Sequence, residues 1–284
     1  MRILISGSNG MLGSAIKEVF KNDELILTDI ESLDVRESKQ VMSYADKKPE
    51  LIIHLAALTD LEYCERNPGE AYYTNHVGTI NMRNLSKSLN VDMVYISTAG
   101  VFDGKKDSYC DDDIPNPLNI YGKSKWCGEI CFSDKLAHHY TFRASWMMGG
   151  GEKDKKFVNL IYKQIRAGKK EIYAINDVYG CPTYTYDLAM TIKNVIDNDA
   201  PYGFYNCAGE GRASRYDVAK TIVEFLHVDV EVIGVKDGYF KEKFPCQRSK
   251  CEVLINRKLN ELNLSKMRPW REALKEYIEK CYTL

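Results

Sequence analysis

The sequence predicts an α/β protein, in which a Rossmann-type, doubly wound parallel sheet is joined to a smaller C-terminal α/β domain. Two observations predict it. Short apolar runs rich in Ile, Leu and Val alternate with helical segments over residues 1–150, and a glycine-rich turn follows the first run directly. Short, continuous apolar runs are typical of strands that are buried on both faces. Strands that alternate with helices form parallel sheets covered by helices.

The first unit is a strand, a turn and a helix over residues 2–21, with glycines at positions 7, 10 and 13 of the turn. The early glycines permit a tight turn and close approach of the backbone to a pyrophosphate, and the last lets the helix pack on the strand. The helix N-terminus then faces the phosphates. The residues of this turn that we predict to bind a dinucleotide are Gly7, Asn9, Gly10, Met11, Leu12 and Gly13.

The second strand, residues 24–28, ends at Asp29. A carboxylate at this place accepts hydrogen bonds from the adenosine ribose and repels a 2′-phosphate. No arginine follows immediately, so NADH is favoured as cofactor and NADPH remains possible. The alternative interpretation of Asp29 is a loop or capping residue. Asp34 either lies near the adenine or caps the helix predicted over residues 36–46.

The third strand, residues 49–55, opens onto Ala56 and Ala57. Ligands of open parallel sheets bind at the carboxyl ends of the strands, where small side chains leave room for a flat molecule. Both alanines are therefore predicted cofactor contacts. His54 lies inside the apolar run, which favours a hydrogen-bonded core histidine over a ligand.

A helical stretch over residues 68–89 leads to the fourth strand, residues 93–96, after which Thr98 is expected at the same edge of the sheet. The acidic run at 111–113 is most simply a solvated loop. The fifth strand is predicted over residues 140–143.

Tyr121 and Lys125 stand four residues apart near the start of a predicted helix. Positions i and i+4 share one face of a helix. An adjacent ammonium favours the phenolate and lowers a tyrosine pKa that begins near ~10, which suits a general acid. The spacing alone also occurs on solvated helix surfaces, so the pair is informative only together with Thr98 and the glycine-rich turn.

The composition favours a protein that binds small molecules. The chain of 284 residues carries 39 Lys and Arg against 40 Asp and Glu, so no broad basic surface for nucleic acid or an anionic membrane is expected. The apolar runs are too short for a signal peptide or a membrane span, which predicts a cytoplasmic protein. Nine scattered cysteines without a Cys-x-x-Cys pair predict neither a disulfide framework nor a metal site.

The second half is predicted to form the smaller, substrate-binding domain over residues 151–284, with residues 178–200 returning to the first domain. Neither a repeat nor a low-complexity linker separates the two, so a shared interface with a cleft between them is expected. The segments expected in the smaller domain are a helix with apolar residues at 157–165, extended chain at 172–183, Tyr205, a helix at 214–226, a strand at 230–235 and a helix at 269–280.

Six ordered blocks resemble the extended short-chain dehydrogenase/reductases, and within them the dTDP-4-dehydrorhamnose reductase family, over nearly the whole chain. The blocks are residues 7–13; 97–98 with 101–104; 115–117 with 121–125 and 128–129; 143–146; 180–183; and 269–274. The resemblance implies reduction by NAD(P)H of the C4 keto group of a nucleotide-linked 4-keto-6-deoxysugar, in the synthesis of dTDP-rhamnose or a related polysaccharide sugar. The expected assembly is a monomer or homodimer.

In that family the catalytic set maps onto Thr98, Tyr121 and Lys125, and Tyr121 and Lys125 also bind the cofactor. The substrate contacts implied here are Thr98, Ala99, Trp146 and Arg248. The chain departs from the family by having Ala99 and Gly100 where Asp-Tyr is expected, so a carboxylate and a phenol are missing on the sugar side. The basic Arg-Pro segment is replaced by residues 244–249, where Arg248 either binds the anionic substrate or is an ordinary exposed arginine.

Two alternatives remain open. A sugar-nucleotide epimerase of the same fold would keep its nicotinamide tightly bound and recycle it. A non-catalytic regulatory subunit resembling the β subunit of methionine adenosyltransferase would retain the scaffold without turnover. A dehydratase is disfavoured, because Ala99 and Gly100 supply no acid–base pair beside Thr98.

Overall fold

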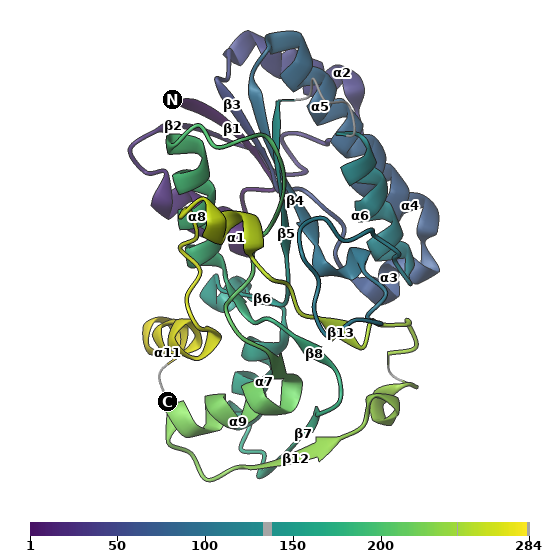
Figure 1. Cartoon of the computed structure of the whole chain (residues 1–284), viewed down its shortest axis with the longest axis vertical. Coiled ribbons are helices and arrows are strands. Elements are labelled where there is room, and N and C mark those ends of the chain that lie inside the picture. The colour runs from purple at the N-terminus through teal and green to yellow at the C-terminus, as the bar shows by residue number, and fades with distance from the viewer. Residues whose placement is uncertain (133–137, 243, 283–284) are drawn as a thin grey trace.

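The computed structural model describes residues 1–132, 138–242 and 244–282, and a six-stranded sheet forms its centre (Figure 1). The strand order is β10-β5-β4-β3-β1-β2, and every neighbouring pair runs parallel. The predicted doubly wound parallel sheet is confirmed. The strands are β1 (Arg2–Ser6), β2 (Glu24–Leu27), β3 (Leu51–His54), β4 (Asp92–Thr98), β5 (His139–Ala144) and β10 (Gly203–Asn206).

Helices cover both faces of this sheet. In Figure 1, α1 (Met11–Val19) and α8 (Thr185–Asp197) lie on one side, and α5 (Gly78–Leu89) and α6 (Ile120–Ile130) lie on the other. Successive side chains of a strand point to opposite faces. Accordingly Ile3 packs into the core beneath α1 and α8, whereas Leu4 packs into the core beneath α5. Burial on both faces explains why the strands are continuously apolar in sequence.

The expected helix over residues 68–89 is interrupted by a π-helical turn, Tyr73–Val77, between α4 (Pro68–Tyr72) and α5. Asn75 lies in this turn, and its side-chain amide donates to the carbonyl oxygen of Leu58 and to Ser124 Oγ, each at 2.9 Å. Such turns are rare and frequently accompany functional sites. This one joins the loop after β3 to helix α6. The other short helices here are α2 (Ser38–Ser43) and α3 (Leu61–Arg66), with 3₁₀ turns at Tyr44–Lys47 and Ala99–Val101.

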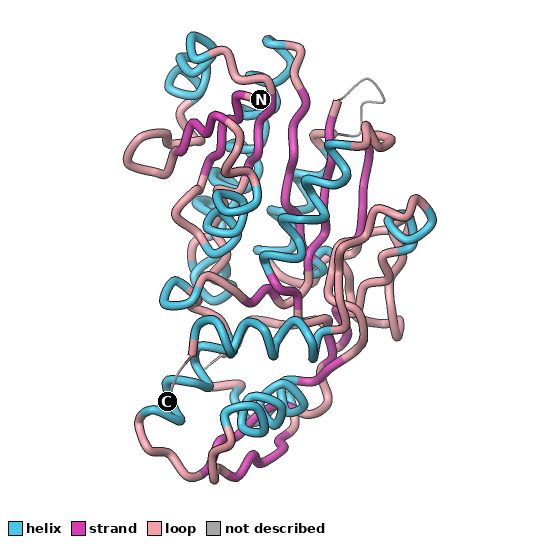
Figure 2. Tube along the Cα trace, turned by 90° about the vertical axis from the view of Figure 1, so that its left-hand side faces the viewer, coloured by secondary structure: helices cyan, strands magenta, loops and turns pink. Residues whose placement is uncertain are grey.

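A smaller part lies below the main sheet in Figure 1, with its own apolar core. Figure 2 shows the same two parts from the side, with the strands of the main sheet in the upper one. The helices of the smaller part are α7 (Phe157–Arg166), α9 (Arg215–Leu226) and α11 (Trp270–Cys281), with 3₁₀ turns at Gly151–Lys153 and Asp237–Phe240. Its strands pair as β7 (Glu171–Ile175) with β12 (Glu231–Val235), β6 (Met147–Met148) with β9 (Thr183–Tyr184), and β8 (Tyr179–Gly180) with both β11 (Ala213–Ser214) and β13 (Cys251–Glu252).

The chain crosses between the two parts more than once. Helix α8 returns to pack on α1, and Leu188 joins the core of the main sheet. The expectation that Tyr205 belongs to the smaller part is wrong, because β10 pairs with β5 at the edge of the main sheet and the Tyr205 ring stacks on Phe142 with centroids 5.7 Å apart. The domain limits at residues 150 and 151 stay a prediction.

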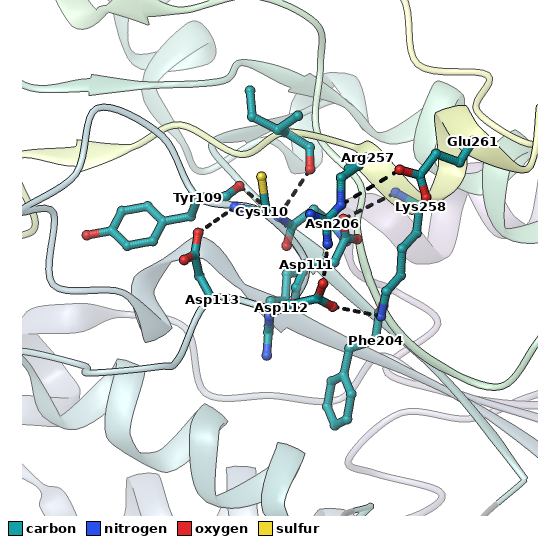
Figure 3. Close-up of polar contacts among 12 residues, drawn as sticks. Tyr109, Cys110, Asp111, Asp112, Asp113, Phe204, Asn206, Arg257, Lys258 and Glu261 are labelled. Carbon is teal, nitrogen blue, oxygen red and sulfur yellow. Dashed lines mark hydrogen bonds and ion pairs between the residues drawn. The ribbon is translucent and has the colours of Figure 1, made fainter.

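The acidic run at 111–113 is not a solvated loop (Figure 3). Asp111 is buried, and its carboxylate accepts from the amide nitrogen of Asn206 on β10 at 2.7 Å. Asp112 forms ion pairs with Arg257 and Lys258 of α10 (Arg257–Glu261). The run therefore anchors the edge strand β10 and helix α10 to the main sheet. These partners are distant in the sequence, so the charge pattern alone could not predict them.

No helix in the described ranges is long and apolar enough to cross a membrane.

Candidate active site

The glycine-rich turn joins β1 to α1 as predicted. Gly7 has φ +70°, and a Cβ there would lie 2.7 Å from the amide nitrogen of Ala56, so this position requires glycine. At Gly13 an added Cβ would lie 2.4 Å from the carbonyl oxygen of Ser8. The cap residue Gly10 offers no side-chain hydrogen bond to the first amides of α1. The turn thus leaves a side-chain-free surface and unsatisfied N–H groups, which fit a pyrophosphate.

Asp29 follows β2 beside this turn. Its carboxylate accepts from the amide nitrogen of Asn9 at 3.0 Å and is partly exposed, which suits a ribose acceptor. Asp34 does not cap α2, whose cap position is Glu37. It is instead held by Arg36, whose guanidinium lies 2.6 Å away and lowers the Asp34 pKa. Of the two aspartates, the geometry leaves Asp29 available to a ligand.

Thr98 and Tyr121 meet at the carboxyl end of β4. Asn119 caps α6 by accepting from the amide nitrogen of Gly122 at 2.8 Å, which fixes the first turn that carries Tyr121. Burial raises the pKa of Tyr121 to about 12, and its hydrogen bond with Thr98 acts in the opposite direction. A phenol with this pKa is fully protonated at neutral pH. The pair thus presents a proton donor beside a hydroxyl.

Lys125 lies one turn further along α6 and is 3% exposed. Burial lowers its pKa to about 7. Its Nζ stands 4.2 Å from the centroid of the Tyr95 ring. We expected Lys125 to lower the pKa of Tyr121, but here Lys125 is not among the groups that shift it. The reason is that the ammonium lies over Tyr95, and burial dominates at Tyr121.

His54 is the core histidine that the sequence favours. Its Nδ1 lies 2.7 Å from Ser6 Oγ, and its Nε2 lies 3.3 Å from Thr79 Oγ1. Burial lowers its pKa to about 3, so the ring is neutral. It stacks on Tyr95 and thereby links the end of β1 to the ring beneath Lys125. Ala56 and Ala57 follow β3 and are partly exposed beside Gly7.

The position where the family carries Asp-Tyr forms a 3₁₀ turn, Ala99–Val101. Ala99 is 0% exposed and packs into a cluster with Phe102 and Leu254, so its role as a substrate contact stays a prediction. A Cβ at Gly100 would lie 3.4 Å from Thr98 Oγ1 and 3.7 Å from Tyr121 Cε1. A side chain at this position would therefore contact both Thr98 and the ring of Tyr121.

Trp146 and Arg248 lie on the side of the smaller part. The indole Nε1 of Trp146 donates to Glu252 Oε2 at 2.7 Å. Arg248 is partly buried and pairs with Glu62 at 2.8 Å, so it is not an ordinary exposed arginine. Burial raises the pKa of Glu252, and the charge of Arg248 partly offsets this increase.

Two residues of this site were missed by sequence reasoning. Glu252, on β13, raises the pKa of Tyr121 through its charge, and Arg215, at the start of α9, stacks on the Trp146 ring with its Cζ 3.7 Å from the centroid. They are distant in sequence from each other and from Tyr121. A carboxylate or a guanidinium without a motif gave no signal, and only the fold brings them together.

A cavity of about 240 Å³ lies elsewhere, at the exposed edge of the sheet. Its lining residues are Pro201, Tyr202, Phe204, Tyr205, Lys258, Glu261 and Leu262, none of which is a predicted site residue. Within the described residues, no group of three or more His, Cys, Asp or Glu side chains could hold a metal ion.

A parallel sheet with a glycine-rich first turn, with Thr98 at the end of β4 and with Tyr121 and Lys125 on the following helix α6, is typical of the short-chain dehydrogenase/reductase class. Residues 1–283 match the model of the family described as the RmlD substrate binding domain, and the chain belongs to that family. It is 30% identical to the spore coat polysaccharide biosynthesis protein SpsK of Bacillus subtilis over 282 residues, which cover 98% of this chain and 97% of that protein.

Solved structures agree with this assignment. A dTDP-4-dehydrorhamnose reductase from Clostridium acetobutylicum superposes with a TM-score of 0.91 at 36% identity, covering 99% of both chains. A dTDP-4-dehydrorhamnose reductase from Bacillus anthracis, in complex with NADP, gives a TM-score of 0.90 at 29% identity, covering 98% of this chain and 99% of that chain. The fold is therefore that of a reductase family.

Proposed function

We propose that this protein reduces the C4 keto group of a nucleotide-linked 4-keto-6-deoxysugar with NAD(P)H, with dTDP-4-dehydrorhamnose as the foremost substrate. The observation that carries the proposal is the partly buried, protonated Tyr121 hydrogen-bonded with Thr98 at the end of a sheet whose first turn fits a pyrophosphate. Membership of the family supports the substrate class.

The residues that would hold the cofactor are those of the glycine-rich turn, together with Asp29, Ala56 and Ala57. A bound reduced nicotinamide supplies a hydride to C4 of the sugar and is itself oxidised. The unpaired amides at the start of α1 favour the pyrophosphate. Asp29 favours a ribose that bears a free 2′-hydroxyl, which supports NADH, whereas the B. anthracis relative binds NADP.

Each catalytic side chain has a distinct task. As C4 receives the hydride, negative charge develops on the carbonyl oxygen, and the Tyr121 hydroxyl donates its proton there to give an alcohol. Thr98 donates a hydrogen bond to the same oxygen. Lys125 contributes a cation next to the cofactor ribose when it is protonated, and its pKa of about 7 allows both states near neutral pH.

The direct test is the stoichiometry of the reaction. The purified chain is incubated with dTDP-4-dehydrorhamnose and with either NADH or NADPH, and both the cofactor absorbance and the sugar product are followed. One equivalent of cofactor should be oxidised per sugar reduced, with a higher kcat/KM for NADH.

Two outcomes would contradict the proposal. Conversion of the sugar nucleotide to an isomer without net loss of cofactor absorbance would identify an epimerase. Absence of turnover with keto sugars linked to dTDP, UDP, GDP and CDP, beside an active reductase as control, would favour a regulatory subunit.

A further inference from the structure

In the described residues, one carboxylate oxygen of Glu252 accepts a hydrogen bond and the other, the open oxygen, has no partner. Oε2 accepts from Trp146, and Oε1 is the open oxygen. The backbone beneath it is fixed, because β13 pairs with β8 and Ser145 Oγ donates to the carbonyl oxygen of Glu252 at 2.9 Å. Burial raises the pKa of Glu252, whereas Trp146, Arg215 and Arg248 lower it. A partly buried carboxylate that is held in place and has one oxygen without a partner is suited to accept a hydrogen bond from a ligand.

Arg215 lies between two aromatic rings. Its Cζ is 3.7 Å from the centroid of the Trp146 ring and 4.9 Å from that of Phe157. In the described part of the chain, the guanidinium makes no hydrogen bond and no ion pair within 4.0 Å. Burial lowers its pKa to about 10, so it remains charged at neutral pH. Stacking of this kind orders the indole and keeps a positive charge near Glu252.

Trp146 is held in an uncommon backbone conformation, with φ +31°. Its ring lies on Gly180, where an added Cβ would approach Trp146 Cε2 to 2.4 Å. Bulky residues rarely adopt a positive φ, and such strain concentrates at functional sites. The indole is therefore fixed on three sides, by Gly180, Arg215 and Glu252.

The position of this group relative to Tyr121 gives it a role. Thr98 at the end of β4 pairs with Ala144 at the end of β5, two residues before Trp146, and the indole of Trp146 holds Glu252 on this side of the sheet. Burial is the main cause that raises the Tyr121 pKa, and the charge of Glu252 adds to it. The 3₁₀ turn after Thr98 carries Ala99 and Gly100 and offers neither a carboxylate nor a phenol to a sugar. The smaller part thus brings a carboxylate, an indole and a guanidinium to the place where the main sheet has none.

We propose that Glu252 is a specificity-determining residue whose open oxygen accepts a hydrogen bond from a hydroxyl of the keto sugar, in place of the carboxylate missing beside Thr98. Arg215 is a positioning residue that acts through Trp146. This inference rests on the proposed function, because it assigns the contact with the sugar at the same site.

Binding measurements distinguish contacts with the sugar from contacts with the nucleotide. The affinities of dTDP and dTDP-L-rhamnose are measured by calorimetry for the wild type and for Glu252→Gln, Glu252→Ala and Arg215→Met, all saturated with NADH. The wild type should bind dTDP-rhamnose more tightly than dTDP. Glu252→Ala should weaken dTDP-rhamnose by roughly 10-fold or more and leave dTDP unchanged, since hydrogen bonds to a charged group are worth more than a tenfold change in affinity.

Steady-state kinetics distinguish the sugar contact of Glu252 from the positioning role of Arg215. Glu252→Gln keeps an acceptor for Trp146 and should raise KM for the keto sugar with less effect on kcat. Arg215→Met should also raise KM, with partial recovery in Arg215→Lys, which retains the charge but not the planar stacking group. The exposed Glu272 gives the matched control, and Glu272→Gln should leave every value unchanged.

Each failure has its own outcome. Equal affinity of the wild type for dTDP and dTDP-rhamnose would overturn the proposed function and this inference with it. If the wild type binds dTDP-rhamnose more tightly than dTDP and Glu252→Ala keeps this difference, the inference alone would be overturned. An equal loss of affinity for dTDP and dTDP-rhamnose in Glu252→Ala would assign Glu252 to the nucleotide and would also overturn the inference. A thermal transition that matches that of the wild type would establish that each variant is folded.

Discussion

Lys125 is the residue in which burial and function conflict most directly. An ammonium that is 3% exposed has lost most of its hydration, and the negative charge of Glu129 only partly offsets this loss. Its usual pKa of 10.5 falls to about 7. A residue that served the fold alone would be replaced by an apolar side chain, so the cost supports a role in binding the cofactor.

This cost predicts a dependence of stability on pH. Below about pH 7 the lysine is protonated in both states, and the full penalty for burying a charge applies. Between pH 7 and 10.5 the folded state has released the proton and the unfolded state retains it, so stability rises with pH. Lys125→Met should therefore be more stable than the wild type at acid pH, and this advantage should shrink by about 2 to 3 kcal/mol between about pH 6 and pH 9.

Urea denaturation of the cofactor-free proteins at both pH values measures this effect. The comparison of the two proteins at each pH removes the contributions of other titrating groups. An advantage of Lys125→Met that stays constant across the range would mean that Lys125 titrates as an ordinary solvated lysine.

Helix α6 is the element on which the site depends, and both of its ends are anchored. Asn119 caps its start and also donates to the carbonyl oxygen of Gln247 at 2.9 Å, which ties the helix to the segment carrying Arg248. Near its end, Glu129 forms a buried ion pair with Arg143 of β5, at 2.9 and 2.8 Å. Their side chains are 3% and 5% exposed. The phenol of Tyr121 is thus placed by contacts outside its own turn.

Removal of one partner of this ion pair should be strongly destabilising. Arg143→Met leaves the Glu129 carboxylate buried without its cation, which typically costs about 3–5 kcal/mol. The double variant Arg143→Met with Glu129→Met should recover much of this loss, because two apolar side chains leave no buried charge. Chemical denaturation gives the free energies of unfolding, and additive losses in the double variant would show that the two residues do not act as a pair.

The elements that sequence predicts well are those whose signal is local. The run Ile3-Leu4-Ile5 is buried on both faces and is typical of a strand, and the following Gly7 and Gly13 meet backbone atoms that exclude a Cβ. Tyr205 was misplaced because β10 has four residues and gains its identity only by pairing with β5. The acidic run was misjudged for a similar reason, since Arg257 and Lys258 are far away in the sequence.

At the scale of the whole molecule, the main sheet supplies the chemistry and the smaller part supplies further groups to the same site. Thr98, Tyr121 and Lys125 were identified from a motif and from resemblance, because their spacing is fixed by one strand and one helix. Glu252 and Arg215 could not be, since β13 and α9 reach Trp146 only through the tertiary fold. Comparison with relatives defines the class of reaction, and Glu252 and Arg215 are the residues that we propose for recognition of the sugar.

The most direct test of the account is the turnover of Tyr121→Phe, with the exposed Tyr173→Phe as matched control. The account predicts that Tyr121→Phe binds NADH with nearly unchanged affinity, keeps the wild-type fold, and loses turnover of dTDP-4-dehydrorhamnose by a factor of ~10² or more, because it lacks the proton donor. Turnover of Tyr121→Phe equal to that of Tyr173→Phe would contradict the central claim.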